Sequence, residues 1–189
     1  MAASAGVLAA TIIGVGLLTP GYRPLTDAVS RLGESDEPFA AIWRSGFVVY
    51  GLLVIAGSTA LGTYSPSRRR LLARLIGGFG ATAIVAGLAP KDAPDAAHTL
   101  TSQVHVAATI LGGTALLTAM ALVARSAPKR GDRVTAAAIA IFSTIGVMVF
   151  PATWGTPLYG FIELGLLTFA ATWLTILALR IAWNASLTR

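Results

Sequence analysis

Hydrophobic and polar residues follow one another along this chain in long blocks rather than in short periods. Six apolar stretches are separated by hydrophilic connections. A helix needs roughly 20 residues to cross a hydrocarbon core of ~30 Å, and most of the stretches reach or approach that length. The pattern predicts an all-α polytopic membrane protein, a single domain over residues 1–189 built as a six-transmembrane-helix bundle. The predicted spans are Ala2–Thr19, Phe39–Tyr64, Leu71–Ala89, Val104–Val123, Val134–Phe150 and Leu158–Trp183.

The amino-acid composition supports a membrane protein and excludes other classes of protein. Hydrophobic residues make up 55% of the 189 residues, charged residues only 12%, and the mean hydropathy is +0.74. These values exclude a disordered chain and an ordinary soluble protein. The chain has no cysteine, which excludes disulfides and thiolate metal sites. The first stretch lacks a basic flank and a small-residue cleavage site, so we expect a retained helix rather than a secretory signal.

The basic residues are distributed unevenly between the connections. Ten of the 14 lie in one alternate set of connections and at the C-terminal end, accompanied by a single acid, Asp132. The positive-inside rule then predicts a multi-pass protein of the cell membrane with both termini in the cytoplasm and three acidic connections outside. The basic excess favours contact with anionic lipids over nucleic-acid binding. The ten residues are Arg68, Arg69, Arg70, Arg74, Arg125, Lys129, Arg130, Arg133, Arg180 and Arg189.

The polar segment between Pro20 and Pro38 carries its own pattern. Its apolar positions have helical spacing and its polar positions occupy the opposite face, with Gly33 where a C-cap would stand. We expect a short amphipathic helix on the outer membrane surface. Asp27 and Arg31 are spaced to form an i,i+4 pair. The apolar face comprises Leu25, Ala28, Val29 and Leu32, and the polar face Asp27, Ser30, Arg31 and Glu34.

Two later connections add expectations of the same kind. Asp92 and Asp95 are expected to begin the fourth long helix. Trp154 and Tyr159 stand where an interfacial aromatic belt would be. Glycine and serine are frequent within the spans, which favours close packing between helices or against another membrane protein.

Three ionisable residues fall near the outer ends of the predicted spans. Counting ~20 residues from Arg125 and Arg180 places His105 at the outer boundary and Glu163 about one turn inside it. Arg44 lies one turn into the second span. Because a charge in lipid costs several kcal/mol unless it is paired or hydrated, such residues indicate a function. Three interpretations stay open: an Arg44–Glu163 ion pair that joins helices, an outward-facing polar cup shared with His105, or side chains that extend to the interface.

The two histidines of the chain suggest a metal or haem site, but their spacing does not suit one. His98, Ser102 and His105 share one helix face, but His98 and His105 are separated by ~10.5 Å along it, whereas helical zinc pairs are spaced i,i+4. Haem ligands approach iron from opposite faces, which one helix face does not allow. Ser102 lacks the motif of a nucleophile. We therefore predict no cofactor, keep His98 and His105 as the only candidate metal ligands, and leave catalytic residues unassigned.

Several motifs resemble those of the domain-of-unknown-function-998 family of bacterial and archaeal membrane proteins. The segment from Gly21 to Gly33 (GYRPLTDAVSRLG) is the most specific, and Pro90, Asp92, His105 and the Gly160–Glu163 segment add to it. The resemblance covers nearly the whole chain and implies six membrane spans without an established activity. The sequence departs from that pattern at Leu164, where the family is expected to carry a basic residue, and this weakens the idea of a fixed Glu–Arg pair there.

Together these observations predict a protein that binds a lipid headgroup or small polar ligand in an outward-facing polar cup. Arg31 and Arg44 are the expected anion contacts, and Glu163 and His105 the polar partners. Two alternatives remain: an accessory or structural subunit that associates with another membrane protein or with itself, and a membrane-embedded hydrolase, with or without a metal. The expected partners are membrane lipids. The candidate ligand-binding residues are Tyr22, Asp27, Ser30, Arg31, Arg44, Asp92, His105, Tyr159 and Glu163.

Overall fold

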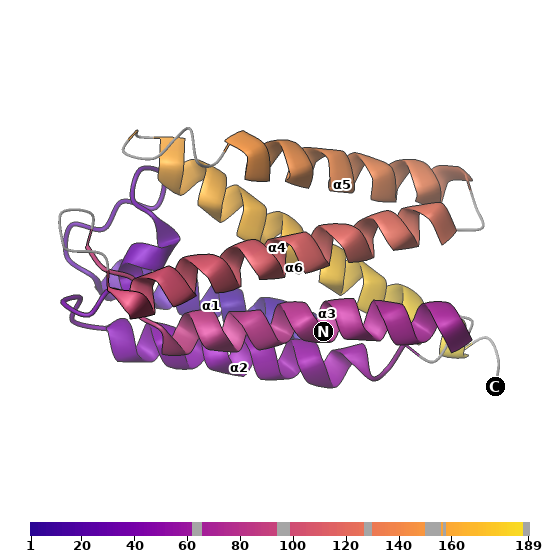
Figure 1. Cartoon of the computed structure of the whole chain (residues 1–189), viewed down its shortest axis with the longest axis horizontal. Helices are drawn as coiled ribbons and strands as arrows, with labels where there is room; N and C mark the ends of the chain where they lie inside the picture. The colour runs from indigo at the N-terminus through magenta and orange to yellow at the C-terminus, as the bar shows by residue number, and fades with distance from the viewer. Residues whose placement is uncertain (62–65, 94–98, 127–129, 150–155, 157, 187–189) are drawn as a thin grey trace.

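The computed structural model describes residues 1–61, 66–93, 99–126, 130–149, 156 and 158–186. Within these ranges the chain is all-helical and contains no strand, as Figure 1 shows. The predicted class is therefore confirmed, and each apolar stretch contributes one long helix. The elements are α1 (Ala2–Leu18), the 3₁₀-helix η1 (Val29–Gly33), α2 (Ala40–Ser58), α3 (Pro66–Leu88), α4 (Leu100–Ser126), α5 (Arg130–Val149) and α6 (Leu158–Ser186).

The six long helices pack in chain order. Each helix contacts the next one, and α1 also contacts α6, so the first and last helices lie together. Consecutive helices run in opposite directions (Figure 1), which brings the starts of α2, α4 and α6 to one end of the molecule. The short η1 packs against α1, α2 and α6 at that same end. The other end carries the exposed Arg68, Arg69 and Arg70 at the start of α3 and Arg125 near the end of α4.

Length and hydropathy do not support six membrane spans. Within the described ranges, four helices are long and apolar enough to cross a membrane: Ala40–Ser58, Arg68–Leu88, Leu100–Arg125 and Leu158–Trp183. The helix α1 has 17 residues and spans only about 25 Å. The helix α5 begins with the polar residues Arg130, Asp132 and Arg133, which shortens its apolar part. Four of the six predicted spans are therefore supported, and the two formed by α1 and α5 stay a prediction, because the apolar stretches in these helices are themselves shorter than a crossing needs.

The end of α1 follows from the proline that the sequence contains there. Proline disfavours helical backbone in the residue before it. Thr19 accordingly takes an extended conformation, and its hydroxyl donates a hydrogen bond to the Val15 carbonyl at 2.9 Å. Gly21 follows with a φ of 73°, a value that glycine adopts without strain. The chain therefore turns sharply at Pro20–Gly21 and re-enters the end of the bundle.

Close backbone contact joins α2 to α3. The carbonyl oxygen of Gly51 would lie 2.7 Å from a Cβ built on Gly80, and the reverse contact is equally tight. Small residues at such crossings allow the dispersion contacts that hold membrane helices together where water supplies no drive. At this crossing the Tyr50 ring of α2 packs edge-on against the Phe79 ring of α3, with centroids 6.1 Å apart. The α2–α3 pair is thus the most closely joined part of the bundle.

We predict that Gly80→Leu disrupts this crossing and lowers the thermal unfolding temperature in detergent by at least 5 °C or abolishes folding. Gly78 on the same helix has no atom within 4 Å of a built Cβ, so Gly78→Leu is the matched control and should change the temperature little. Fluorescence-detected unfolding measures both variants. Equal effects of the two substitutions would contradict the close crossing.

Candidate functional site

The segment after α1 is not a helix on the membrane surface. Only Val29–Gly33 is helical, and it forms a single 3₁₀ turn whose Val29 and Leu32 side chains are fully buried. Leu25, expected on the same apolar face, is 60% exposed and lies outside the turn. The expectation of an amphipathic surface helix was wrong because helical spacing of apolar residues also fits a turn inserted between helices. The turn forms part of the bundle's interior.

Glu163 binds the backbone at the start of this turn. Its carboxylate accepts hydrogen bonds from the Val29 N–H at 2.7 Å and the Ser30 N–H at 3.3 Å. Helix starts leave N–H groups without partners, and an anion placed there satisfies them. A residue of α6 therefore caps a turn that lies 134 positions earlier in the chain.

Glycine makes this contact possible. Gly160 lies one turn before Glu163 on α6, and a Cβ there would collide with the backbone of Asp27. Gly33, expected as a C-cap, is the last residue of η1 and has no positive φ; the Trp43 ring occupies the space where its side chain would be. Both glycines therefore serve close packing around η1.

The Arg44–Glu163 ion pair does not form. The Nε of Arg44 donates to the Gly33 carbonyl at 3.0 Å, and an Nη donates to the Ser35 hydroxyl at 3.4 Å. Arg44 thus binds the end of η1 while Glu163 binds its start. Charge alone suggested the pair, whereas both side chains find partners in the backbone of the same turn.

The guanidinium of Arg31 also has partners within the protein. Its guanidinium donates to Asp27 at 2.8 Å and to Glu37 at 2.8 Å. The predicted i,i+4 pair of Asp27 and Arg31 is confirmed, and Glu37 adds a second carboxylate. Because both carboxylates accept hydrogen bonds directly from its guanidinium, the donors of Arg31 are taken up and it is poorly suited to the expected role of anion contact.

Lys91 is the buried cation of this end. It is 6% exposed, its Nζ donates to the Ser30 hydroxyl at 3.4 Å, and it lies 5.4 Å from the centroid of the Tyr159 ring. Its charge also acts on Glu34 and Glu163. The Ser30 hydroxyl bonds in turn with the Glu163 carboxylate, so this serine connects the lysine to the glutamate. We call Tyr22, Ser30, Glu34, Lys91, Tyr159 and Glu163 the polar cluster.

One member of the polar cluster, Tyr22, has a buried hydroxyl without a hydrogen-bond partner among the described residues. Glu34 is buried as well, since its residue is only 4% exposed. Burial raises the pKa of Glu34 from its ordinary 4.5 to about 7, although the charge of Lys91 acts in the opposite direction. Burial and the charge of Glu163 also raise the pKa of Tyr22, which keeps its proton. Buried polar groups normally have partners, so the Tyr22 hydroxyl is the group of the polar cluster that a water or a ligand would satisfy.

His105 and Asp92 hold the junction between α3 and α4. The Nδ1 of His105 donates to the carbonyls of Ala86 and Ala89, both at 2.9 Å. Asp92 accepts from the backbone N–H of Thr99 at 2.6 Å, immediately before α4 begins. Both residues satisfy backbone groups at helix ends. His105 remains a neighbour of the polar cluster, because the charge of Lys91 reaches it.

The residues considered for metal binding and hydrolysis lie in different surroundings within the described part of the chain. In the part of the chain that the structure describes, no three His, Cys, Asp or Glu side chains form a group that could hold a metal ion. The Ser102 hydroxyl accepts from the Asp92 N–H at 3.3 Å, and His105 turns its Nδ1 to α3, so these two residues do not form a catalytic pair. His98, Asp95 and Trp154 lie outside the described residues.

Tyr22, Ser30, Tyr159 and Glu163 were predicted site residues and lie in the polar cluster. Lys91 and Glu34 were not predicted. Both occur in hydrophilic connections, where a charged residue usually faces water. The available signal was weak: Lys91 directly follows Pro90, and the segment before α2 carries more acids than bases.

We predict that Glu163→Leu exposes the start of η1. The Val29 and Ser30 amides lose bonds to a charged acceptor, each contributing about 1.5–3 kcal/mol, so their hydrogen exchange should accelerate at least tenfold. Glu163→Gln keeps one acceptor oxygen and should have a smaller effect. Asp36→Asn, at an exposed position nearby, is the control. Unchanged exchange in Glu163→Leu would contradict the capping role.

The raised pKa of Glu34 predicts a pH-dependent stability. The folded state holds this proton up to about pH 7 and the unfolded state only up to about 4.5, so the free energy of unfolding falls as pH rises between these values. The loss is of order 2 kcal/mol. In Glu34→Gln this part of the dependence should be absent, as measured by thermal unfolding from pH 4 to 8. Parallel curves for the two proteins would exclude a buried, protonated Glu34.

Comparison with known proteins identifies the family of this chain but provides no activity for it. No curated protein and no solved structure matches the chain. One family, described as "Protein of unknown function (DUF998)", matches residues 2–180 and so covers almost the whole length. The capped turn, the buried lysine and the α3–α4 junction all lie within this match, and the chain belongs to the DUF998 family.

Proposed function

We propose that the protein is a multi-pass membrane protein that binds a zwitterionic lipid headgroup at the polar cluster. The supporting observation is a buried lysine whose charge acts on two glutamates, together with the Tyr22 hydroxyl, which lacks a partner among the described residues. Lys91 suits an anionic group such as a phosphate, and Glu34 suits an ammonium group. Such a ligand would supply a partner to the Tyr22 hydroxyl as well.

The balance of charge favours a zwitterion over a simple anion. Lys91 and Glu163 offset one another, and Glu34, with a pKa of about 7, is about half ionised at neutral pH. A bare anion would therefore meet a cation that is already neutralised and a second carboxylate close by. A ligand with charges of both signs adds no net charge to a site of low dielectric, where an unpaired charge is expensive.

We further propose that all six long helices lie in the membrane, with both termini in the cytoplasm and the polar cluster facing outward. The exposed arginines at the start of α3 and near the end of α4 support this orientation through the positive-inside rule. The helix α1 is short and the charged start of α5 shortens its apolar part, but each helix packs along neighbours that are long enough to span. Local thinning of the bilayer accommodates such a mismatch at modest cost.

Binding of short-chain lipids to the purified protein tests the headgroup proposal. Native mass spectrometry should show dihexanoyl phosphatidylethanolamine bound at least fivefold more tightly than dihexanoyl phosphatidylglycerol. Lys91→Met should weaken binding of the first lipid at least tenfold, and Glu34→Gln should remove the preference between the two.

Arg23→Gln is the matched control, since it removes a positive charge from a side chain at the same end that is 77% exposed. It should leave both affinities unchanged. The proposal would be refuted if Lys91→Met and Arg23→Gln bound dihexanoyl phosphatidylethanolamine with equal affinity while both proteins eluted as folded species. Tighter binding of phosphatidylglycerol would refute the zwitterion in particular, and Glu34→Gln tests this point even if Lys91→Met does not fold.

A further inference from the structure

Two tyrosine rings belong to the polar cluster, and the protein itself covers both of them. The Nζ of Lys91 lies over the ring of Tyr159, 5.4 Å from its centroid. A Cβ built on Gly16 of α1 would lie 3.1 Å from a ring carbon of Tyr22. Both tyrosines are only 9% exposed. A lysine of the chain therefore already occupies the place over Tyr159 that a ligand cation would need.

A third ring, that of Trp43, lies beside the cluster and is used for packing. The Phe47 ring stacks on it with centroids 4.2 Å apart. Gly33, which directly precedes Glu34, packs against the same indole. Trp43 is only 2% exposed. Its ring thus joins η1 to α2 and leaves no open face for a ligand.

The two common kinds of lipid ammonium group need different surroundings. A trimethylammonium has no N–H group, and proteins bind it against the faces of aromatic rings. A primary ammonium has three N–H donors and needs oxygen acceptors. Because a buried charge without compensation is expensive, a site that lacks one kind of partner rejects the corresponding cation.

The polar cluster offers oxygen acceptors. The carboxylate of Glu163 is taken by the backbone of η1, whereas the carboxyl of Glu34, a buried residue, is the second acid of the cluster. The hydroxyl of Tyr22 has no hydrogen-bond partner among the described residues. The cluster also shows how it holds a primary ammonium, because the Nζ of Lys91 donates to the Ser30 hydroxyl.

Resting on the function proposed above, we infer that the cationic group of the ligand is a primary ammonium, as in an ethanolamine headgroup, and that the polar cluster rejects the trimethylammonium of choline. The ammonium donates to Glu34 and to the Tyr22 hydroxyl, and the phosphate lies at Lys91. A serine headgroup carries the same ammonium but adds a carboxylate next to Glu34, so ethanolamine is the better fit.

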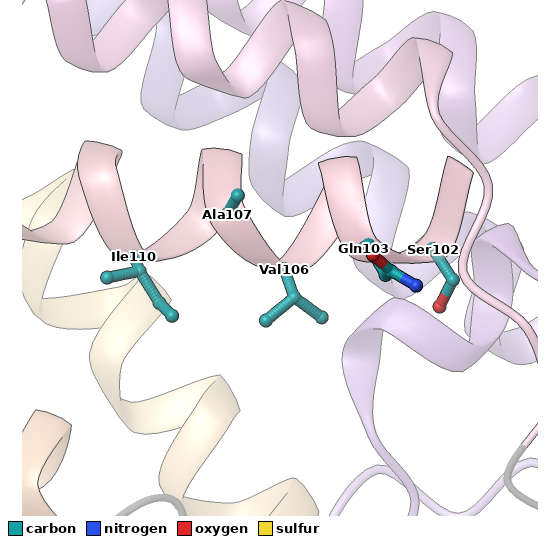
Figure 2. Close-up of a pocket in the computed structure, with 5 residues that line it drawn as sticks. All are labelled: Ser102, Gln103, Val106, Ala107 and Ile110. Atoms are coloured by element: carbon teal, nitrogen blue, oxygen red, sulfur yellow. The ribbon is translucent and has the colours of Figure 1, made fainter. Parts of the chain in front are cut away.

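The surface of α4 provides no alternative site for choline. Figure 2 shows a shallow hollow on the first third of this helix, and its described lining residues include neither an aromatic ring nor an acid. It therefore lacks both kinds of partner that a cation needs. The lining residues are Ser102, Gln103, Val106, Ala107 and Ile110.

A series of headgroups that differ only in methylation tests the inference on the unchanged protein. Native mass spectrometry at pH 8, where most of Glu34 is ionised because its pKa is about 7, compares dihexanoyl phosphatidylethanolamine, its N-methyl derivative and dihexanoyl phosphatidylcholine. We expect phosphatidylcholine to bind at least tenfold more weakly than phosphatidylethanolamine, with the N-methyl derivative between them. Dihexanoyl phosphatidylserine should also bind more weakly than phosphatidylethanolamine.

Glu34→Gln and Asp36→Asn form a matched pair of variants. Both remove one negative charge from the same segment, but Glu34 is buried in the polar cluster and Asp36 is exposed. Glu34→Gln should bind phosphatidylethanolamine and phosphatidylcholine within threefold of each other, whereas Asp36→Asn should keep the tenfold preference. A preference that survives Glu34→Gln, or that both substitutions reduce equally, would overturn the inference. Tighter binding of phosphatidylserine would overturn the choice of ethanolamine.

The same measurements separate this inference from the function on which it rests. If phosphatidylethanolamine and phosphatidylcholine bind equally tightly and Lys91→Met weakens both, the headgroup site stands and the selectivity for a primary ammonium is wrong. If neither lipid binds, the proposed function itself fails, and the inference fails with it.

Discussion

The contact between the Glu163 carboxylate and the backbone of η1 is the interaction on which this end of the molecule depends. A 3₁₀ turn buried among helices has N–H groups that neither water nor its own backbone can satisfy. Glu163 supplies the acceptor, and its charge is offset by Lys91 through Ser30. If either Glu163 or Lys91 is replaced by a neutral residue, the opposite charge stays buried without compensation, which strongly destabilises the fold. The turn, the lysine and the glutamate therefore form one unit.

This unit also joins distant parts of the chain. The turn follows α1, the lysine follows α3 and the glutamate lies on α6, so a single group of polar contacts connects the first, middle and last thirds of the sequence. Arg44 adds α2 through its bond to the Gly33 carbonyl. The helices α1 and α6 also pack together, so the polar contacts add to a junction that the two helices already form.

The sequence predicted what depends on length and composition. The six helices were found because lipid requires long apolar stretches, and the Asp27–Arg31 pair because helical and turn geometry both bring residues four apart together. The burial of η1 was missed because the spacing of Val29 and Leu32 fits a surface helix equally well. The partners of Glu163 could not be predicted, because its acceptor role depends on backbone amides more than a hundred residues away. Lys91 resembled an ordinary loop lysine for the same reason: its burial is set by the helices around it.

The absence of cysteine makes the central claim, that η1 is buried and held by Glu163, directly measurable. Single substitutions Ser30→Cys and Ser35→Cys place one thiol inside the turn and one on the exposed segment after it. In native membranes a membrane-impermeant maleimide should label Ser35→Cys at least tenfold faster than Ser30→Cys, and adding Glu163→Leu should bring the two rates together. Equal labelling rates in the otherwise unchanged protein would place η1 on the surface and contradict this account.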